Sequence, residues 1–210
     1  MAFPQMRVLS LCAGLGGLCE AFVRSGDEVL RVDNNPLLSE VECMSIQDIK
    51  EMGERLHLYH AQGQPIREYD VLMAGIPCHE FSLAFSAPQA IASRAGDFDD
   101  YEPSMDLLEC VLDIIRITKP RYWLIENVMG SIRHFAKYGL EPRLIVGSHV
   151  LYGNFPLFDK NIEMPTKADR DKGPNPLRSN IRAKVPISLS VALRKAIVEQ
   201  KTLFDDYNNP

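Results

Sequence analysis

Short runs of hydrophobic residues alternate along the chain with longer segments in which hydrophobic positions recur at helical spacing. The runs at 8–11, 28–32, 69–74 and 121–125 predict buried strands. A stripe of apolar residues predicts a helix that is capped by Ser104 and ends before Pro120; its members are Leu107, Leu108, Val111, Leu112 and Ile115. This alternation predicts an α/β fold with a mostly parallel sheet and helices on both faces.

The other segments complete one domain. Residues 1–152 form the predicted core, in which 143–152 is a strand and Ser82–Tyr101 is a long active-site loop. Residues 153–184 are rich in proline and predict an extended connector. Residues 185–204 then form a last helix, which is capped by Ser188 and completes the core; its apolar face is Leu189, Ala192, Leu193, Ala196 and Ile197.

Composition narrows the class of protein. The chain has 210 residues, 46% of them hydrophobic, which suits one globular domain. Its five cysteines have neither a disulfide-like nor a zinc-site spacing, so we expect reduced thiols and no metal. There is no apolar stretch of membrane-spanning length and no signal-type leader. We therefore expect a cytoplasmic protein that does not associate with membranes.

Charge is distributed unevenly. Residues 166–195 hold eight basic and two acidic side chains, a net charge of +6, although the whole chain carries −5. An acidic protein with one basic segment can contact a polyanion locally, and Arg178 and Arg182 are candidates for phosphate contacts. On charge alone, a solvated basic surface explains the segment equally well.

Three chemical features follow three predicted strands. A glycine turn, Ala13 to Gly17, follows the first strand, Cys78 follows the third in Gly-Ile-Pro-Cys, and Glu126-Asn127 follows the fourth. Ligands of open α/β sheets bind beyond the carboxyl ends of the strands. A thiol, a carboxylate and a glycine turn at that edge predict an enzyme.

Each feature also has a structural explanation. Asp33 follows Gly14 by 19 positions, the separation of an acid that binds the ribose hydroxyls of NAD or S-adenosylmethionine, but a tight turn without a ligand has the same pattern. A cysteine after an apolar strand is commonly a packing residue, and Cys78 needs positive potential nearby to become a nucleophile. Glu126 can be a structural carboxylate bound by backbone amides.

Together and in this order, the motifs resemble those of the cytosine carbon-5 DNA methyltransferase family. The resemblance covers roughly residues 7–130, and Pro77-Cys78 and Glu126-Asn127-Val128 are its most specific parts. It implies a Rossmann-like methyltransferase fold, S-adenosylmethionine as methyl donor with S-adenosylhomocysteine as product, and double-stranded DNA as substrate.

The resemblance also implies the chemistry. The Cys78 thiolate adds to carbon-6 of a flipped cytosine, Glu126 holds the pyrimidine, carbon-5 accepts the methyl group and loses its proton, and the thiol is then eliminated. Ser82 and Asn127 would contact the substrate. The residues implied for the cofactor are Cys12, Ala13, Gly14, Leu15, Gly16, Gly17, Asp33, Asn34, Asp48, Ile49, Pro77 and Val185.

The chain departs from the family pattern in several places. His79 stands where a glutamine is common, and Cys12 where a phenylalanine is often found. The family's arginine that holds the flipped base is not recognisable; Arg143 is the first candidate and His149 the next. Only about thirty residues occupy the place of a recognition domain. Either residues 153–184 and the catalytic loop read a short sequence, or a specificity partner supplies recognition.

Other functions fit parts of this pattern. A cytosine methyltransferase that acts on RNA or a free nucleotide needs no duplex-reading domain. A catalytically idle nucleic-acid-binding partner of the same fold would have no chemical need for Cys78 or Glu126. A nicotinamide enzyme fits the glycine turn, but no hydride-handling group accompanies it.

Overall fold

The computed structural model describes residues 5–84, 86–97, 99–163 and 174–208, with side chains as far as Gln200. The strands are β1 (Arg7–Leu11), β2 (Glu28–Asp33), β3 (Met44–Ile46), β4 (Val71–Gly75), β5 (Tyr122–Val128), β6 (Leu144–Val146) and β7 (His149–Asn154). The helices are α1 (Glu20–Arg24), α2 (Ile49–Ala61), α3 (Pro88–Ala95), α4 (Asp106–Thr118), α5 (Ile132–Phe135), α6 (Arg178–Ala183) and α7 (Ile187–Asn208). None of the helices in the described part is both long and apolar enough to cross a membrane.

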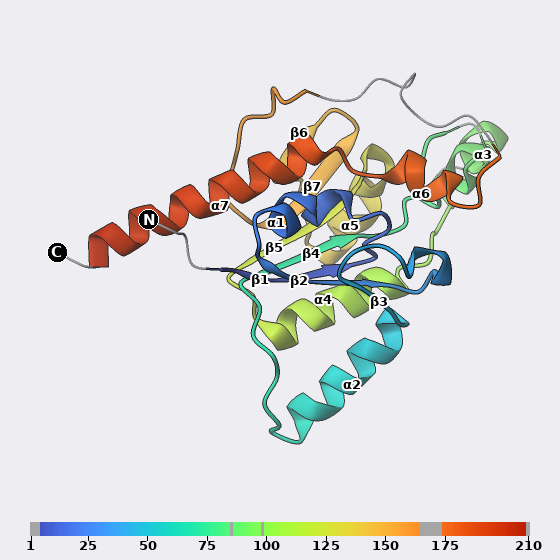
Figure 1. Cartoon of the computed structure of the whole chain (residues 1–210). Helices are drawn as coiled ribbons and strands as arrows, with labels where there is room; N and C mark the ends of the chain where they lie inside the picture. The colour runs from blue at the N-terminus through green and yellow to red at the C-terminus, as the bar shows by residue number, and fades with distance from the viewer. Residues whose placement is uncertain (1–4, 85, 98, 164–173, 209–210) are drawn as a thin grey trace.

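The described strands form one seven-stranded sheet in the order β3-β2-β1-β4-β5-β7-β6 (Figure 1). The first five in this order run parallel, and β7 pairs antiparallel with both β5 and β6. From β1 the chain builds outward through β2 and β3, then crosses to the other side of β1 to form β4. The strand order therefore reverses between β1 and β4, and ligand sites of open α/β sheets lie at such reversals.

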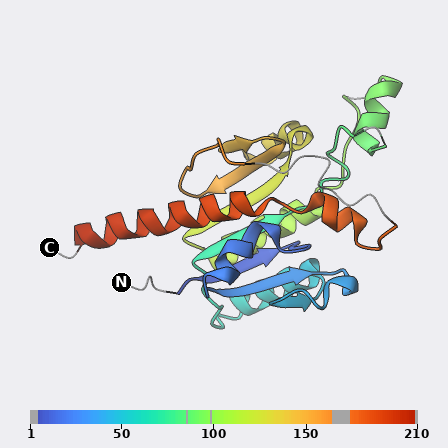
Figure 2. The same cartoon turned by 45° about the horizontal axis from the view of Figure 1, so that its top comes forward.

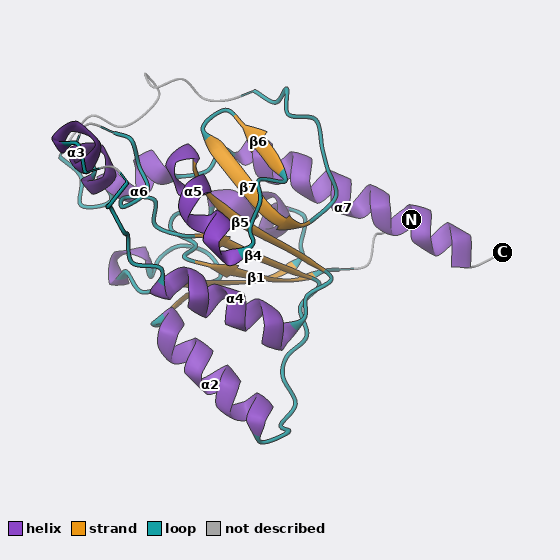
Figure 3. Cartoon of the chain, turned by 180° about the vertical axis from the view of Figure 1, so that it is seen from behind, coloured by secondary structure: helices purple, strands orange, loops and turns teal. Residues whose placement is uncertain are grey.

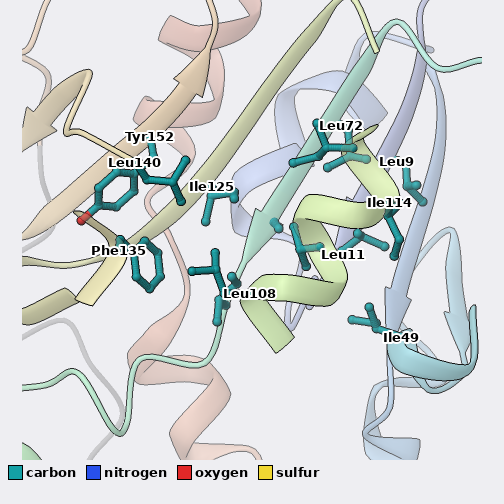
Figure 4. Packing of buried hydrophobic residues seen from close by; sticks show 14 of the residues in the cluster. Leu9, Leu11, Ile49, Leu72, Leu108, Ile114, Ile125, Phe135, Leu140 and Tyr152 are labelled. Atoms are coloured by element: carbon teal, nitrogen blue, oxygen red, sulfur yellow. The ribbon is translucent and has the colours of Figure 1, made fainter. Parts of the chain in front are cut away.

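Helices cover both faces of the sheet, as predicted (Figures 1 and 3). On one face, α2, α4 and α5 pack against residues such as Leu9, Leu72 and Ile125 (Figure 4). On the other face, α1 and α7 pack against Val8, Met73 and other buried strand residues. Alternate residues of a strand point to opposite faces, so strands buried on both sides must be apolar throughout. This requirement explains the continuous hydrophobic runs in the sequence.

Three predicted elements differ in the structure. The strand expected over 143–152 is a hairpin, β6 and β7, because Gly147, with a positive φ of 59°, lies in the connecting turn. The loop Ser82–Tyr101 includes helix α3, which begins at Pro88. Similarly, the connector 153–184 contains the short helix α6.

Both predicted N-caps were wrong. Met105 occupies the cap position of α4, and Ser104 lies one residue before it. Ser188 lies within the first turn of α7, where its hydroxyl donates to the Glu163 carbonyl oxygen at 2.7 Å. The apolar stripe of α7 is confirmed, since Leu189, Leu193 and Ile197 are fully buried. Strand β3 was not expected; it is three residues long and pairs only with β2 among the described strands.

Candidate active site

Strand register brings Cys78 and Glu126 to the same edge of the sheet. Gly75 at the end of β4 is paired with Glu126 in β5, and Cys78 follows Gly75 by three residues. Glu126 and Asn127 belong to β5 itself, whereas the sequence suggested that the strand stops before them. Glu126 is buried at 8% exposure, and the Cys78 thiol is half-buried. A nucleophile and a carboxyl group thus share one sheltered strand end.

The turn that carries Cys78 is held on two sides. The buried amide of Asn127 donates to the Ile76 carbonyl oxygen at 3.2 Å, and the Phe81 amide donates to the Cys78 carbonyl oxygen at 3.1 Å. Phe81 packs edge-on against Phe135 of α5. Asn127 was expected to contact substrate; its amide instead holds the backbone that precedes Cys78.

The turn also requires a glycine on the facing segment. A Cβ atom on Gly130 would lie only 2.0 Å from the Phe81 carbonyl oxygen, which is far inside van der Waals contact. Ser82, next along the chain, accepts a hydrogen bond from the Ala84 amide at 3.0 Å. The structure therefore uses the Ser82 hydroxyl to shape the start of the loop that follows Cys78.

The two carboxylate oxygens of Glu126 face different neighbours. Oε1 lies 2.7 Å from Nδ1 of His149 in β7. Oε2 faces β4, where a Cβ atom added to Gly75 would lie 4.0 Å from it. Arg143, the first candidate for a base-holding arginine, is directed elsewhere: its Nε donates to the Phe155 carbonyl oxygen at 2.7 Å. The second candidate, His149, is the one that the fold places on Glu126.

The surroundings of Cys78 favour its thiol over its thiolate. Burial raises the pKa of Cys78 above its ordinary value, and the negative charge of Glu126 raises it further. Both effects disfavour a thiolate, because a second negative charge would form in a poorly solvated place. Nucleophilic chemistry here therefore requires that the charge of Glu126 be compensated.

The glycine turn after β1 is fastened to β2 through Asp33. One carboxylate oxygen of Asp33 accepts from the Gly14 amide at 2.9 Å and the other from the Asn35 amide at 3.0 Å. Gly14 has a φ of +52°, and a Cβ there would meet only Asn180 Nδ2, at 3.8 Å. Each oxygen of Asp33 keeps a lone pair that a ribose hydroxyl can use, so the turn and its acid fit a nucleoside ligand.

Gly16 and Gly17 serve packing. A Cβ on Gly16 would lie 2.4 Å from Cζ of Arg31, and one on Gly17 would lie 2.2 Å from the Val185 carbonyl oxygen. The chain after α6 thus returns to the glycine turn, and Val185 is buried against it. This contact places Val185 beside the turn to which the sequence assigned it.

Sequence reasoning missed Arg31, which is fully buried in β2 beneath the glycine turn. Its guanidinium donates to Glu20 Oε2 at 2.8 Å, to the Glu42 carbonyl oxygen at 2.9 Å and to the Gly16 carbonyl oxygen at 3.3 Å. Its Nε lies 3.1 Å from the Cys19 sulfur. An arginine inside an otherwise apolar strand was the available signal.

The remaining residues that the sequence assigned to the cofactor differ in their exposure and in their contacts. Asp48 caps α2 by accepting from the Lys50 and Glu51 amides. Ile49 is buried in the core, so little of its surface can meet an adenine. Cys12 has a positive φ of 50°, and burial, followed by the charge of Asp33, raises the pKa of its thiol far above the ordinary value. Ala13 and Leu15 are half-buried in the turn, whereas Asn34 and Pro77 are exposed.

Two helices flank this edge of the sheet. Helices α3 and α6 lie at the same end of the molecule in all three overall views (Figures 1, 2 and 3). Arg178 and Arg182 are exposed on α6, while Asn180 turns inward and accepts from Asn35 Nδ2 at 3.4 Å. Asn180 was not identified from the sequence. Of the predicted basic segment, Lys167, Arg170 and Lys172 lie outside the described residues.

Comparisons with known proteins agree with this geometry. The family model for C-5 cytosine-specific DNA methylases matches residues 6–144. The Type II methyltransferase M.XorII of Xanthomonas oryzae pv. oryzae is 29% identical over an alignment of 148 positions that covers 63% of this chain and 31% of that protein. The orphan methyltransferase M.Rho11sI of Bacillus phage rho11s is 28% identical over 136 residues, covering 62% of this chain and 24% of that protein.

Among solved structures, a TehB-like SAM-dependent methyltransferase from Corynebacterium glutamicum is similar with a TM-score of 0.41 and 16% identity, covering 71% of this chain and 79% of that one. The chain spans about a quarter to a third of the length of the two curated relatives. The family match covers well over half of the chain, including the glycine turn, Cys78 and Glu126. The chain therefore belongs to the C-5 cytosine-specific DNA methylase family.

Proposed function

We propose that this protein transfers a methyl group from S-adenosylmethionine to carbon-5 of cytosine in double-stranded DNA. The observation that carries the proposal is the placement of Cys78 and Glu126 on paired strand ends beside the strand-order reversal, in a chain of this family. The glycine turn after β1 lies on the other side of the same reversal. Donor and acceptor sites would thus adjoin at one edge.

Cys78 and Glu126 have different roles in the proposed reaction. Carbon-5 of cytosine is a weak nucleophile, so a bond from the Cys78 sulfur to carbon-6 is needed to raise its electron density. Glu126 Oε2, on the β4 side, holds the ring nitrogen and amine and stabilises the charge that develops during this addition. Carbon-5 then bonds to the methyl group, loses its hydrogen as a proton to solvent water, and the carbon–sulfur bond breaks, which releases the Cys78 thiolate.

The cofactor would lie against the glycine turn. S-adenosylmethionine supplies a methyl group on a positively charged sulfur and leaves as S-adenosylhomocysteine. Asp33 would accept hydrogen bonds from the ribose hydroxyls, and the sugar would lie against Gly14, next to Asn180. Asp48 can act only through the lone pairs left by its capping bonds. We assign no metal to the reaction, since the proposed steps need only the thiol and the carboxyl group.

The substrate base must leave the duplex to reach Cys78, because carbon-6 is covered by stacking within DNA. The segment Ser82–Tyr101, with α3, would close over the flipped base. Exposed Arg178 and Arg182 on α6 would bind phosphates. Sequence recognition would come from residues 153–184 and this loop, or from a specificity partner.

We place this activity in the cytoplasm of a bacterial or phage-infected cell, where the DNA substrate is found. The named relatives include a Type II methyltransferase and an orphan methyltransferase from a phage. Methylation within a restriction-modification system, or of phage DNA, is the corresponding biological role.

The decisive experiment measures transfer of labelled methyl groups from S-adenosylmethionine to unmodified duplex DNA. Cys78→Ala is compared with Cys43→Ala, because Cys43 is an exposed cysteine remote from β4 in sequence. Label recovered as 5-methylcytosine with the parent chain and Cys43→Ala, and lost with Cys78→Ala, supports the proposal. Label on RNA or free nucleotide instead of DNA would redirect the substrate assignment, and no label on any of the three would overturn the activity.

A second experiment tests the phosphate contacts. Reversing charge at Arg178 and Arg182 should weaken duplex binding and reduce the slope of log affinity against log salt by about one for each phosphate that is no longer neutralised. Arg116→Glu is a matched control, since Arg116 is exposed on α4 and pairs with Asp113 one turn earlier in the same helix. Unchanged binding after reversal at both positions would contradict a role for α6 in binding DNA.

A further inference from the structure

The contact between His149 and Glu126 follows from the antiparallel pairing of β5 and β7. His149 lies opposite Val128, so it is diagonal to Glu126 on the same face of the pair. Their side chains are 12% and 11% exposed, and Nδ1 lies 2.7 Å from Oε1. This is the length of a charge-assisted hydrogen bond in a poorly solvated place.

We propose that His149 is the positioning residue for Glu126, holding Oε1 so that Oε2 faces the flipped pyrimidine. This inference rests on the proposed function. It extends that function by giving a role to His149, which lies beyond the residues that the family model matches.

The two carboxylate oxygens of Glu126 have different roles. A carboxylate on a strand can rotate about its terminal bond, and only one orientation places Oε2 on the β4 side near Gly75 and the Cys78 turn. Donation from Nδ1 to Oε1 favours that orientation. Removing the imidazole would let the carboxyl group rotate, which lowers the fraction of molecules ready to hold a base.

Two other titratable groups face the pair. The Cys78 thiol lies at the end of β4, and the Tyr152 hydroxyl from β7 is paired with Ser131 at 2.8 Å. Burial, followed in each case by the charge of Glu126 among the raising effects, raises the pKa of both groups. Neither therefore supplies positive charge to Glu126. The hydrogen bond from His149 is the contact that disperses the carboxylate charge opposing a Cys78 thiolate.

Arginine is the informative replacement at position 149. A guanidinium donates hydrogen bonds to carboxylates, so His149→Arg keeps a donor for Oε1 of Glu126. His149→Gln removes the imidazole and its hydrogen bond. The difference between the two variants therefore reports on the donor to Glu126.

The test uses covalent capture, which reports on addition by Cys78 directly. In duplex DNA that carries 5-fluorocytosine, the methylated adduct cannot lose a proton from carbon-5, so protein and DNA remain joined. Capture rates of the parent chain, His149→Gln and His149→Arg are compared under the same conditions. His57→Gln is the matched control, because His57 is exposed on α2. S-adenosylmethionine binding is measured for each variant by calorimetry.

We expect His149→Gln to bind the cofactor normally but to be captured roughly tenfold more slowly or worse, which corresponds to losing one hydrogen bond to a charged group. His149→Arg should be captured faster than His149→Gln, because a guanidinium can donate to Oε1, and this difference guards against general structural damage. A parent-like capture rate in His149→Gln, with the parent captured, would overturn the role of His149 alone. No capture by the parent would overturn the proposed function and this inference together.

Discussion

The side-chain amide of Asn127 donates a hydrogen bond to the carbonyl oxygen of Ile76, two residues before Cys78. Asn127 is fully buried, and its own Oδ1 accepts from the Val128 amide at 2.8 Å. One side chain thus connects β5, which carries Glu126, to the turn that carries the thiol. The relative position of nucleophile and carboxyl group depends on this connection.

Replacing Asn127 by alanine should destabilise the protein by about 2 kcal/mol, because the buried Ile76 carbonyl and Val128 amide both lose their side-chain partner. Chemical denaturation measures this change. Asn154→Ala, which removes an exposed amide-to-carbonyl bond in β7, is the control and should cost less than about 0.5 kcal/mol. Equal effects of the two substitutions would show that the bond to Ile76 has no special importance.

The reactivity of Cys78 should depend on the charge of Glu126. Because that charge raises the pKa of the thiol, Glu126→Gln should lower the pKa and speed alkylation by iodoacetamide at any pH below it. Mass spectrometry of the alkylated Cys78 peptide across a pH series measures the shift. Glu141→Gln, an exposed glutamate, should leave the titration of Cys78 unchanged. A pKa that stays the same or rises in Glu126→Gln would refute this electrostatic coupling.

Arg31 and Arg24 both pair with Glu20, but only Arg31 is buried, at 2% against 66% side-chain exposure. Arg31→Met should destabilise the chain by about 3 kcal/mol, since it leaves buried acceptors without a donor, and should weaken S-adenosylmethionine binding through Gly16. Arg24→Met should cost less than about 1 kcal/mol. Thermal unfolding measures the loss of stability, and calorimetric titration measures S-adenosylmethionine binding. Similar losses in Arg31→Met and Arg24→Met would contradict a special role for the buried Arg31.

His134 should make stability fall in acid. Burial, followed by the neighbouring charge of Arg133, lowers the pKa of His134, so the unfolded chain binds a proton more readily than the folded one. Its contribution to stability is complete above the pKa of the unfolded chain and is lost as the pH falls. Between about pH 7.5 and about pH 5.5, the free energy of unfolding should change less with pH in His134→Gln than in the parent, as measured by chemical denaturation.

A matched substitution checks that interpretation. His57→Gln on the exposed face of α2 should keep the full pH dependence of the parent. His134 Nε2 lies 3.0 Å from Gln89 Oε1 in α3, so the loss of stability in acid should include loosening of α3. If the free energy of unfolding depends on pH in the same way in His134→Gln and His57→Gln, His134 is not responsible for the loss of stability in acid.

Prediction from sequence succeeded where burial on both faces forces a continuous apolar strand. Strands β1, β2 and β4 were expected within two residues of their observed bounds, and α4 has the predicted apolar face. It failed where backbone geometry decides the outcome. The turn at Gly147 divides 143–152 into a hairpin, and the caps of α4 and α7 depend on where each chain segment enters its helix.

By itself, the sequence determined the α/β class, the identity of the family and the three motifs, because hydrophobic period and motif spacing are local properties of the chain. Only the tertiary structure decided which side chains meet. His149 reaches Glu126, and Arg143 turns to Phe155, through the register of β7, while Arg31 underlies Gly16 through the pairing of β1 with β2. Register depends on the packing of the whole sheet, and moving a strand by one residue turns every side chain to the opposite face.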